Sequence, residues 1–298
     1  MKNPQGERLR PIAGRHNALI KQVRRAFARG ELTPEGECAV EGVRMVEEAI
    51  RSGLRLRAVL FSESGQTRAG RLLPQLGNQV ETVLLPDKLF TSMVPSETPQ
   101  GVAALVQVKS FALENLLESG AGPALVVVVA GVQDPGNLGT ILRSAEAFAA
   151  SGVLLGENTA GAYNSKTVRA SAGSVFRIPL AKRELREALP ALREGGLRLL
   201  ATSSHKGRPL SEASLSVPVA LLVGSEGGGL TREIMAQVDE VIAIPHSPKV
   251  ESLNAGVAAS IVLYEAARQR SFHHRATEAQ KKAGIESARG EDGNGQHH

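Results

Sequence analysis

The sequence predicts an α/β protein with two parts, a small N-terminal α/β domain and a larger C-terminal domain with a mostly parallel sheet. Three observations predict this class. Short apolar runs alternate with longer helical stretches in the second half, a smaller set of similar elements fills the first half, and a turn-rich segment lies between them. The 298 residues suffice for two domains of ordinary size.

The first domain, residues 15–110, begins with a segment that has the pattern of an amphipathic helix. Residues 15–29 place four apolar side chains on one helical face, namely Leu19, Ile20, Val23 and Phe27. A second helix is expected over residues 38–51. Strand-like apolar runs follow at residues 58–61, 80–85 and 102–108. These elements predict a small α/β domain.

A linker is expected at residues 111–123, because its last six residues are small and turn-forming. The second domain then spans residues 124–270. Its expected strands are the apolar runs at residues 125–130, 153–155, 197–201, 220–223 and 241–244, with helices such as 138–150 and 185–193 between them. Such alternation indicates a mostly parallel sheet covered on both faces. Residues 271–298 are polar and lack an apolar pattern, which predicts a disordered tail.

Basic residues concentrate at the start of the chain. Residues 1–29 carry eight Lys or Arg and one Glu, whereas the whole chain has a net charge of +5. Residues 1–14 are predicted to be a basic, flexible N-terminus. A localised basic stripe suits a polyanion such as RNA or DNA, although a solvated helix face would look the same. The candidates for RNA binding are Arg15, Lys21, Arg24 and Arg25.

The composition disfavours several classes of protein. The single cysteine, Cys38, has no partner for an internal disulfide or a thiolate metal site, which suits a reducing cytoplasm. The longest apolar run, residues 124–132, is too short to span a bilayer, and no signal peptide follows the charged start. The lack of Trp argues against a base-stacking platform. We expect a cytoplasmic protein that uses neither a membrane nor a metal.

Polar side chains follow three of the predicted strands. In the loop at residues 133–143, Asn137 is the expected N-cap of a helix and Arg143 lies within that helix. This loop lacks a Walker or dinucleotide-binding signature. The loop at residues 224–230 is rich in glycine and centred on Glu226, which disfavours a phosphate and favours hydroxyls, amines or a cation.

The third loop, residues 244–254, ends in Ser252-Leu253-Asn254 before a helix that is apolar nearly all round and should be buried. Ser252 is the expected N-cap, but ordinary capping does not explain so polar an entrance. The roles of His246 and Lys249 stay open. Because the carboxyl ends of parallel strands share one edge, the three loops predict a site that binds a small polar ligand and activates a hydroxyl.

These three loops resemble the motifs of a known family. The second half is similar to the SpoU (TrmH-like) branch of the SPOUT methyltransferases, which methylate ribose 2′-hydroxyls of RNA with S-adenosylmethionine. The resemblance rests on Asn137-x-Gly139-x-x-x-Arg143, on Gly224-x-Glu226-x-x-Gly229, and on Ile244-Pro245 followed by Ser252-Leu253-Asn254. The first half resembles an RNA-binding domain of the ribosomal-protein L30e type, with its similarity at residues 40–50 and 99–106.

The resemblance implies a fold, a cofactor and an assembly. The C-terminal domain would be an α/β/α SPOUT domain with a deep trefoil knot, and the protein would be a homodimer with its site completed near the subunit interface. The residues implied to bind S-adenosylmethionine are Thr202, Gly224, Ser225, Glu226, Gly229, Ile244, Pro245, Ser252, Leu253 and Asn254. The residues implied in catalysis are Arg143, Asn137, Glu226, Ser252 and Asn254.

The expected reaction is methylation of a ribose 2′-hydroxyl, with 23S rRNA as the favoured substrate. Arg143 would orient the hydroxyl and stabilise developing negative charge, since an arginine is normally protonated. The alternatives are a tRNA 2′-O-methyltransferase and a non-catalytic RNA-binding or ribosome-assembly factor on the same fold. The chain departs from the family pattern in a polar 246–249 segment and in Gly256, which is smaller than usual.

Overall fold

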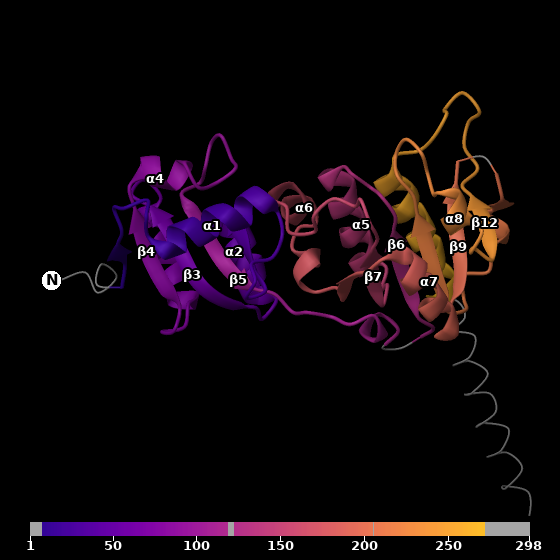
Figure 1. The fold of residues 1–298 in the computed structure, drawn as a ribbon, viewed down its shortest axis with the longest axis horizontal. Coiled ribbons are helices and arrows are strands. Elements are labelled where there is room, and N and C mark those ends of the chain that lie inside the picture. The colour runs from indigo at the N-terminus through magenta and orange to yellow at the C-terminus, as the bar shows by residue number, and fades with distance from the viewer. Residues whose placement is uncertain (1–7, 119–121, 205, 272–298) are drawn as a thin grey trace, which may run out of the picture.

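The computed structural model describes residues 8–118, 122–204 and 206–271. The chain forms two sheets, one in each half, that lie side by side along the long axis of the molecule (Figure 1). Helices of the C-terminal half lie between the two sheets (Figure 1). The predicted α/β class with a mostly parallel second sheet is confirmed. The trefoil knot stays a prediction.

The N-terminal sheet has five strands in the order β1-β4-β3-β5-β2. The strands are β1 (Arg10–Pro11), β2 (Glu37–Glu41), β3 (Arg55–Ser62), β4 (Glu81–Leu85) and β5 (Val102–Gln107). The helices are α1 (Ala18–Arg29), α2 (Val43–Arg51), α3 (Gln66–Leu72) and α4 (Asp87–Thr91), with a 3₁₀ turn at Leu73–Gln75. A second 3₁₀ turn, Glu114–Leu116, lies in the predicted linker, and its Leu116 is buried in the core of the C-terminal half. Side chains of β3 alternate between a core with α1 and α4 and a core with α2 and α3.

The C-terminal sheet has seven strands in the order β10-β12-β9-β11-β6-β7-β8, and every neighbouring pair is parallel. The strands are β6 (Leu125–Val129), β7 (Gly152–Leu155), β8 (Leu180–Lys182), β9 (Arg198–Ser203), β10 (Arg208–Pro209), β11 (Val219–Val223) and β12 (Glu240–Ala243). The helices are α5 (Pro135–Ala147), α6 (Ser165–Ala170), α7 (Leu185–Glu194), α8 (Arg232–Met235) and a C-terminal helix over residues 255–271, with 3₁₀ turns at Ser174–Phe176 and Leu210–Glu212.

Both faces of this sheet are covered, as β6 illustrates. Val127 and Val129 pack in the core that contains α5 and the C-terminal helix, whereas Val126 and Val128 pack in the core that contains α7. All four side chains are fully buried, and burying each one stabilises the fold by roughly 1.5–3 kcal/mol. A strand buried on both faces reads as an unbroken apolar run, which is why the sequence predicts it correctly.

The structure corrects the prediction of a helix over residues 38–51. Residues 38–41 belong to β2, and the helix α2 begins only after Gly42, whose φ of 92° separates the two elements. Cys38, Ala39 and Val40 are buried on both faces of the sheet edge beside β5. A short apolar run cannot be distinguished from a buried helix by its periodicity alone, so the strand was missed. The elements β1, α3, α4, α6, β8 and β10 were also not predicted.

The N-terminus is also more ordered than predicted where it is described. Within residues 8–14, β1 pairs with β4, and Arg8 donates hydrogen bonds to the carbonyls of Leu73, Leu76 and Gly77. Arg10 forms an ion pair with Glu81. Residues 1–7 and the predicted tail after residue 271 lie outside the described residues.

Two helix starts differ from the prediction. Asp134, and not Asn137, caps α5: its carboxylate accepts hydrogen bonds from the backbone N–H groups of Gly136 and Asn137. Pro135 follows at the first helical position, which suits its fixed φ and missing N–H. Asn254, and not Ser252, caps the C-terminal helix and accepts from the N–H of Val257 at 3.1 Å. Both shifts leave Asn137 and Asn254 where their amide groups meet.

The C-terminal helix is not buried all round. Ala259, Val262, Leu263 and Ala266 are buried, but Val257, Ile261 and Tyr264 are 47%, 37% and 56% exposed. The three exposed residues are spaced four and three positions apart, so they form one apolar face. Tyr264 packs edge-on against Phe148 with ring centroids 5.8 Å apart. The helix therefore has two apolar faces, of which the described residues bury one and cover the other only in part.

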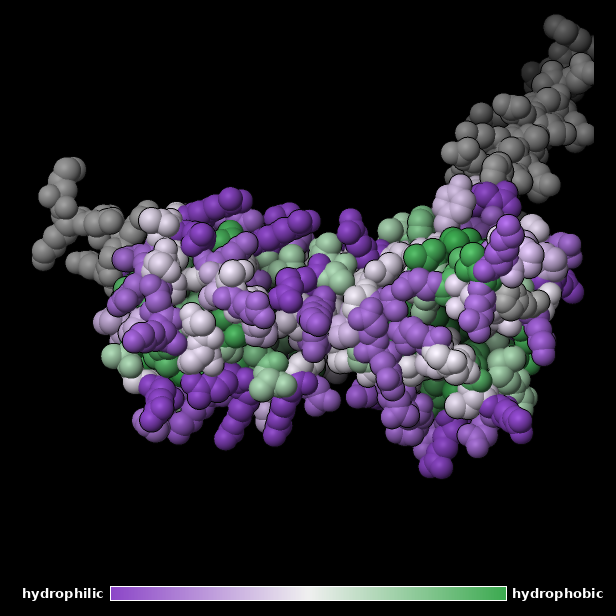
Figure 2. Space-filling model, turned by 90° about the horizontal axis from the view of Figure 1, so that it is seen from above, coloured by the Kyte–Doolittle hydropathy of each residue, from purple (hydrophilic) through white to green (hydrophobic). Residues whose placement is uncertain are grey.

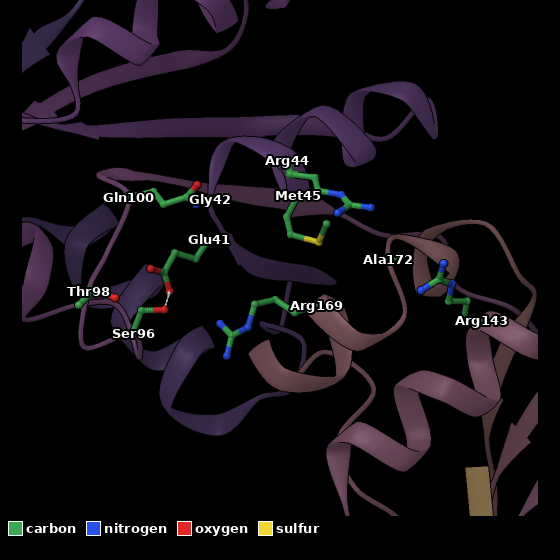
Figure 3. Close-up of a pocket in the computed structure, with 10 residues that line it drawn as sticks. All are labelled: Glu41, Gly42, Arg44, Met45, Ser96, Thr98, Gln100, Arg143, Arg169 and Ala172. Carbon is green, nitrogen blue, oxygen red and sulfur yellow. Dashed lines mark hydrogen bonds between the residues drawn. The ribbon is translucent and has the colours of Figure 1, made fainter. Parts of the chain in front are cut away.

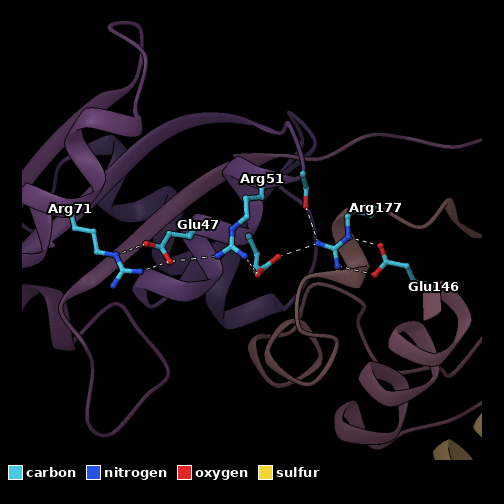
Figure 4. A network of polar contacts seen from close by, with 7 residues as sticks. Glu47, Arg51, Arg71, Glu146 and Arg177 are labelled. Atoms are coloured by element: carbon cyan, nitrogen blue, oxygen red, sulfur yellow. Dashed lines mark hydrogen bonds and ion pairs between the residues drawn. The ribbon is translucent and has the colours of Figure 1, made fainter.

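The two halves share a continuous hydrophobic core. Val40 and Met45 of the N-terminal half pack in the same cluster as Val168 and Phe176 of the C-terminal half. A chain of ion pairs joins the halves at the same junction: Arg177 contacts Glu48 of α2 and Glu146 of α5 (Figure 4). The N-terminal half is thus fixed against α5 and α6.

Candidate functional site

The three predicted loops leave one edge of the C-terminal sheet. The strands β12, β9, β11 and β6 are adjacent in this order, with Ile242 opposite Thr202, Leu222 opposite Ala201 and Val223 opposite Val129. Thr202 lies near the end of β9 and donates its hydroxyl to the carbonyl of Leu222 at 3.1 Å. Gly224 follows β11 and Ile244 follows β12. The parallel register therefore brings these segments together although they are distant in sequence.

A polar network joins the three loops. The amide nitrogen of Asn137 donates to Glu226 Oε1 at 2.9 Å, and the amide nitrogen of Asn254 donates to Asn137 Oδ1 at 2.8 Å. Asn137 is buried and sits at the centre. The backbone N–H groups of Gln133 and Asp134 also donate to the Glu226 carboxylate, at 3.3 and 3.4 Å. One residue from each loop is thus held in a fixed arrangement.

Glu226 is stabilised as a carboxylate in this network. Partial burial by itself would raise the pKa of Glu226, but hydrogen bonds from the Asn137 side chain and from backbone N–H groups, including those of Gln133 and Asp134, outweigh it and lower the pKa below 4.5. A hydrogen-bonded anion at this position would repel a phosphate and attract a cation or a hydroxyl.

Gly224 and Gly229 shape the turn that carries Glu226. The backbone groups of Ser225 and Gly229 exchange hydrogen bonds at 3.1 and 3.0 Å, which closes the loop. A Cβ at position 224 would lie 2.4 Å from the carbonyl carbon of Gly229, so no side chain fits there. Gly229 has a φ of +64°, a conformation that strains other residues. The glycines of this motif are therefore explained by backbone approach.

Gly256 allows the C-terminal helix to approach α5. A Cβ at position 256 would lie 3.1 Å from the Thr140 Cβ and 3.3 Å from the Asn137 carbonyl oxygen. Next along the same contact, the hydroxyls of Ser144 and Ser260 are 2.6 Å apart. The close approach is what places Asn254 within hydrogen-bonding distance of Asn137. The small residue at 256, a departure from the family pattern, thus supports the polar network.

The other predicted residues of the third loop surround the network without joining it. Pro245 and Ser252 are exposed, whereas Ile244 and Leu253 are half-buried. Ile244 packs against the main core, and its carbonyl oxygen lies 2.7 Å from His246 Nδ1. Within the described residues, Ser252 makes no side-chain hydrogen bond. Of the predicted residues in this loop, Asn254 is the one whose side chain is hydrogen-bonded to the network, and the roles of the others stay predictions.

Arg143 does not join the network, contrary to the expectation that the loops gather all the candidate residues. It follows Asn137 by six positions on α5, which is about 9 Å along the helix axis and about 120° around it. Its side chain is exposed and lines a cleft between α5, α6 and the N-terminal half (Figure 3). The site residues of one chain are therefore divided between two surfaces.

The predicted RNA-binding residues lie on a different surface again. Arg15 is exposed before α1, and Lys21, Arg24 and Arg25 are exposed along α1. Arg24 has a weak contact with the Ser92 hydroxyl at 3.4 Å. Because α1 and α2 cover opposite faces of the N-terminal sheet, this basic stripe lies away from the cleft that Arg143 lines.

The described part of the chain contains no helix long and apolar enough to cross a membrane. The same residues contain no group of three or more His, Cys, Asp or Glu side chains arranged to hold a metal ion. The strand-end loops do fit an adenosine-containing sulfonium. They combine main-chain groups and the half-buried Ile244 and Leu253 with a carboxylate, and they lack the arginine cluster that a phosphate would favour.

Sequence comparison identifies the two halves separately. Residues 124–264 match the SpoU rRNA Methylase family, and residues 17–104 match the MRM3-like substrate binding domain. The 23S rRNA (guanosine(2553)-2′-O)-methyltransferase RlmP of Bacillus subtilis (strain 168) is 31% identical over 256 residues, which cover 86% of this chain and 98% of the relative. This chain belongs to the SpoU family of rRNA methylases. The resemblance of its motifs to that family is confirmed.

Further SpoU relatives span both halves of the chain. The 23S rRNA (uridine(2479)-2′-O)-methyltransferase of Streptomyces viridochromogenes is 31% identical over 290 residues, 93% of this chain and 99% of the relative. The crystal structure of the SpoU methyltransferase AviRb from the same species, in complex with the cofactor AdoMet, matches with a TM-score of 0.73 and 29% identity over 86% of this chain and 98% of that one. The structure of an AdoMet-bound rRNA methyltransferase from Sinorhizobium meliloti matches with a TM-score of 0.73 and 27% identity. The match covers 88% of this chain and 98% of that one.

Sequence reasoning missed two residues of this SpoU protein that share the cleft with Arg143. Arg44 lies at the start of α2, and Arg169 lies on α6, an element that was not predicted. Arg44 belongs to the stretch 40–50 that carries the resemblance of the first half, so a signal was present there. Arg169 had none, because its neighbourhood depends on how the two halves pack.

Proposed function

We propose that this protein transfers the methyl group of S-adenosylmethionine to a ribose 2′-hydroxyl of 23S rRNA. The observation that carries the proposal is the Asn137–Glu226–Asn254 network, which joins the three family motifs at the ends of parallel strands. Two relatives named as 23S rRNA 2′-O-methyltransferases align with this chain over nearly their full lengths. The aligned region includes the substrate-binding part of this chain.

S-adenosylmethionine would be held by the strand-end loops. Main-chain groups near Thr202, Gly224, Ser225, Gly229, Ile244 and Pro245 would bind the adenosine, with Leu253 against the base. When bound, the cofactor supplies an electrophilic methyl group on a sulfonium. Glu226, kept anionic by its hydrogen bonds, would contribute a negative charge to the site that holds this cation. Ser252 and Asn254 would position the ribose at the loop entrance.

Arg143 would act on the nucleophile. A hydroxyl is a weak nucleophile until it loses its proton, so charge grows on the ribose oxygen as the methyl is transferred. The Arg143 guanidinium would orient that oxygen and stabilise its charge, because an arginine is protonated at physiological pH. Holding the two reactants in line supplies much of the remaining rate enhancement.

We infer that the site is completed in a homodimer. Arg143 and the Asn137 network lie on separate surfaces of one chain, so a second copy is one way to bring them together. The apolar face formed by Val257, Ile261 and Tyr264 follows directly after Asn254 and suits such an interface. Figure 2 shows larger groups of hydrophobic side chains on the C-terminal half than on the N-terminal half.

The dimer is tested with Ile261→Glu. Sedimentation velocity is expected to show dimers for the unaltered protein and monomers for the variant, with methyl transfer lost in parallel. Leu32→Glu in the N-terminal half is a matched control that should stay dimeric, since Leu32 is an exposed apolar residue outside this face. A monomeric, active unaltered protein would contradict the dimer while leaving the reaction in place.

The reaction itself is tested by tritiated methyl transfer to total RNA from a strain that lacks this protein, separated by size. Label in 23S rRNA supports the proposed substrate. Label in tRNA keeps the chemistry and overturns the substrate. Cofactor binding without label in any RNA favours a non-catalytic RNA-binding or assembly factor.

A further inference from the structure

The cleft that Arg143 lines contains two more arginines without a role in the reaction. It has a volume of about 360 Å³ and lies where α5 and α6 meet the N-terminal half. Arg44 of α2 and Arg169 of α6 line it together with Arg143, and its polar wall includes Glu41, Ser96 and Thr98. Figure 3 shows Arg169 extending from α6 toward the side of Glu41 and Ser96, while Arg143 lies at the end near Ala172. We call this surface the arginine cleft.

The three arginines of the cleft are all exposed, and within the described residues none of their guanidinium groups forms an ion pair or a hydrogen bond. Glu41 is the one carboxylate among the lining residues, and it accepts a hydrogen bond from the Ser96 hydroxyl at 2.8 Å. The cleft lining thus carries a formal charge of +2. A cluster of unpaired guanidinium groups in a concave surface attracts anions, and their planar geometry suits phosphates.

The walls of the arginine cleft are held in place by the ion-pair network. Glu48, one turn after Arg44 on α2, contacts Arg177 at 3.2 Å. Glu146, one turn after Arg143 on α5, contacts the same Arg177 at 2.8 Å. The turn after α6 packs closely, since a Cβ at Gly173 would lie 3.0 Å from the Glu48 Cβ. The helices that carry the three arginines are therefore fixed relative to one another before any ligand arrives, which lowers the entropic penalty of binding.

We propose that Arg44 and Arg169 bind the RNA backbone next to the target nucleotide, so that the strand passes through the arginine cleft to Arg143. This proposal rests on the methyltransferase function proposed above. The lining residues include no aromatic side chain, so the cleft is built to contact phosphates and sugars and not to stack bases. Arg44 and Arg169 are then positioning residues, which bind substrate from both halves of the chain.

The proposal is tested by the double variant R44A/R169A of the full-length protein, with in vitro transcribed 23S rRNA as the probe. Filter binding over a range of salt concentrations is expected to show at least roughly tenfold weaker binding. The slope of log affinity against log salt should become shallower by about 1.4, because two phosphate contacts on single-stranded RNA are lost. Binding of S-adenosylmethionine should be unchanged, and KM for the RNA should rise more than kcat falls.

The double variant R183A/R186A is the charge-matched control. Arg183 and Arg186 are exposed and do not line the cleft, so their removal lowers the net charge by the same two units without touching the cleft. An unchanged affinity and salt slope in R44A/R169A would overturn the proposal. So would an equal loss in R183A/R186A, which would indicate a non-specific charge effect. If the unaltered protein bound this RNA but labelled none, the proposed function would fail independently of the cleft.

Discussion

Two groups of arginines lie at or beside the junction of the two halves, and they differ in their partners. In the ion-pair network, Arg51, Arg71 and Arg177 each contact a carboxylate of Glu47, Glu48 or Glu146 (Figure 4). In the arginine cleft, Arg44, Arg143 and Arg169 contact none. The arginines of the ion-pair network thus hold parts of the fold together. The arginines of the cleft stay available for a ligand.

The difference follows from where the acids are placed. Helix α2 carries Arg44 on the cleft side, and its two carboxylates, Glu47 and Glu48, take part in the network. A paired arginine has its charge compensated and contributes to the packing of the halves. An unpaired one adds to the local potential that draws in a polyanion. The presence of an internal carboxylate partner, and not exposure alone, therefore separates the structural arginines from the candidate functional ones.

The largest effect is expected for Arg143→Ala. Removing a group that stabilises developing oxyanion charge should lower methyl transfer roughly 10²–10³-fold, while S-adenosylmethionine binding by calorimetry stays the same. Arg143→Lys should restore little, because an ammonium lacks the planar fork. Turnover within twofold of the unaltered protein would remove Arg143 from the reaction.

A carboxylate introduced into the arginine cleft should form ion pairs with the cleft arginines, as the glutamates of the ion-pair network do with theirs. Thr98 is exposed on the cleft wall, and Thr98→Glu is expected to weaken 23S rRNA binding about tenfold through competition for the guanidinium groups. Thr98→Gln, of the same shape without the charge, is the control and should bind nearly as well. Thermal stability should stay within about 0.5 kcal/mol in both variants, since the site is on the surface.

Loss of a paired arginine should have a smaller and different effect. Arg177→Ala removes contacts to Glu48 and Glu146, and as these groups are partly solvated the expected loss is about 1 kcal/mol of unfolding free energy. The melting temperature should fall by roughly 2–4 °C. The salt slope of RNA binding should not change, because the three cleft arginines remain. A shallower slope in Arg177→Ala would mean either that Arg177 itself contacts RNA or that the cleft arginines lose RNA contacts once the ion-pair network is broken.

The smallest effect is a pH dependence of the same contact. Hydrogen bonds from Arg177 lower the pKa of Glu146 below 4.5, with partial burial opposing them. A lowered pKa in the folded state gives stability that is present above pH 4.5 and is lost as pH falls through the lowered value. Denaturant unfolding should therefore show a constant difference between Arg177→Ala and the unaltered protein from pH 8 to 5, and a shrinking one below. A difference that grows in acid would contradict this assignment.

The sequence by itself determined the α/β class, the strand ends and the residues of the polar network. Strands buried on both faces appear as unbroken apolar runs, and parallel strands must end at one edge, so three polar loops could be assigned to one place. The network that results joins Asn137 to residues 89 and 117 positions away. The glycines at 224 and 229 were also visible as a motif before the structure gave their physical reason.

Tertiary structure alone decided which of those residues meet. Asn137 and Arg143 belong to one motif, but α5 turns them to different surfaces, and the packing of the N-terminal half adds Arg44 and Arg169 to the surface of Arg143. The exposure of one face of the C-terminal helix could likewise not be predicted from the sequence, because an apolar residue gives the same pattern whether or not a neighbouring element covers it. Ion pairing and burial depend on groups distant in sequence, so local patterns do not encode them.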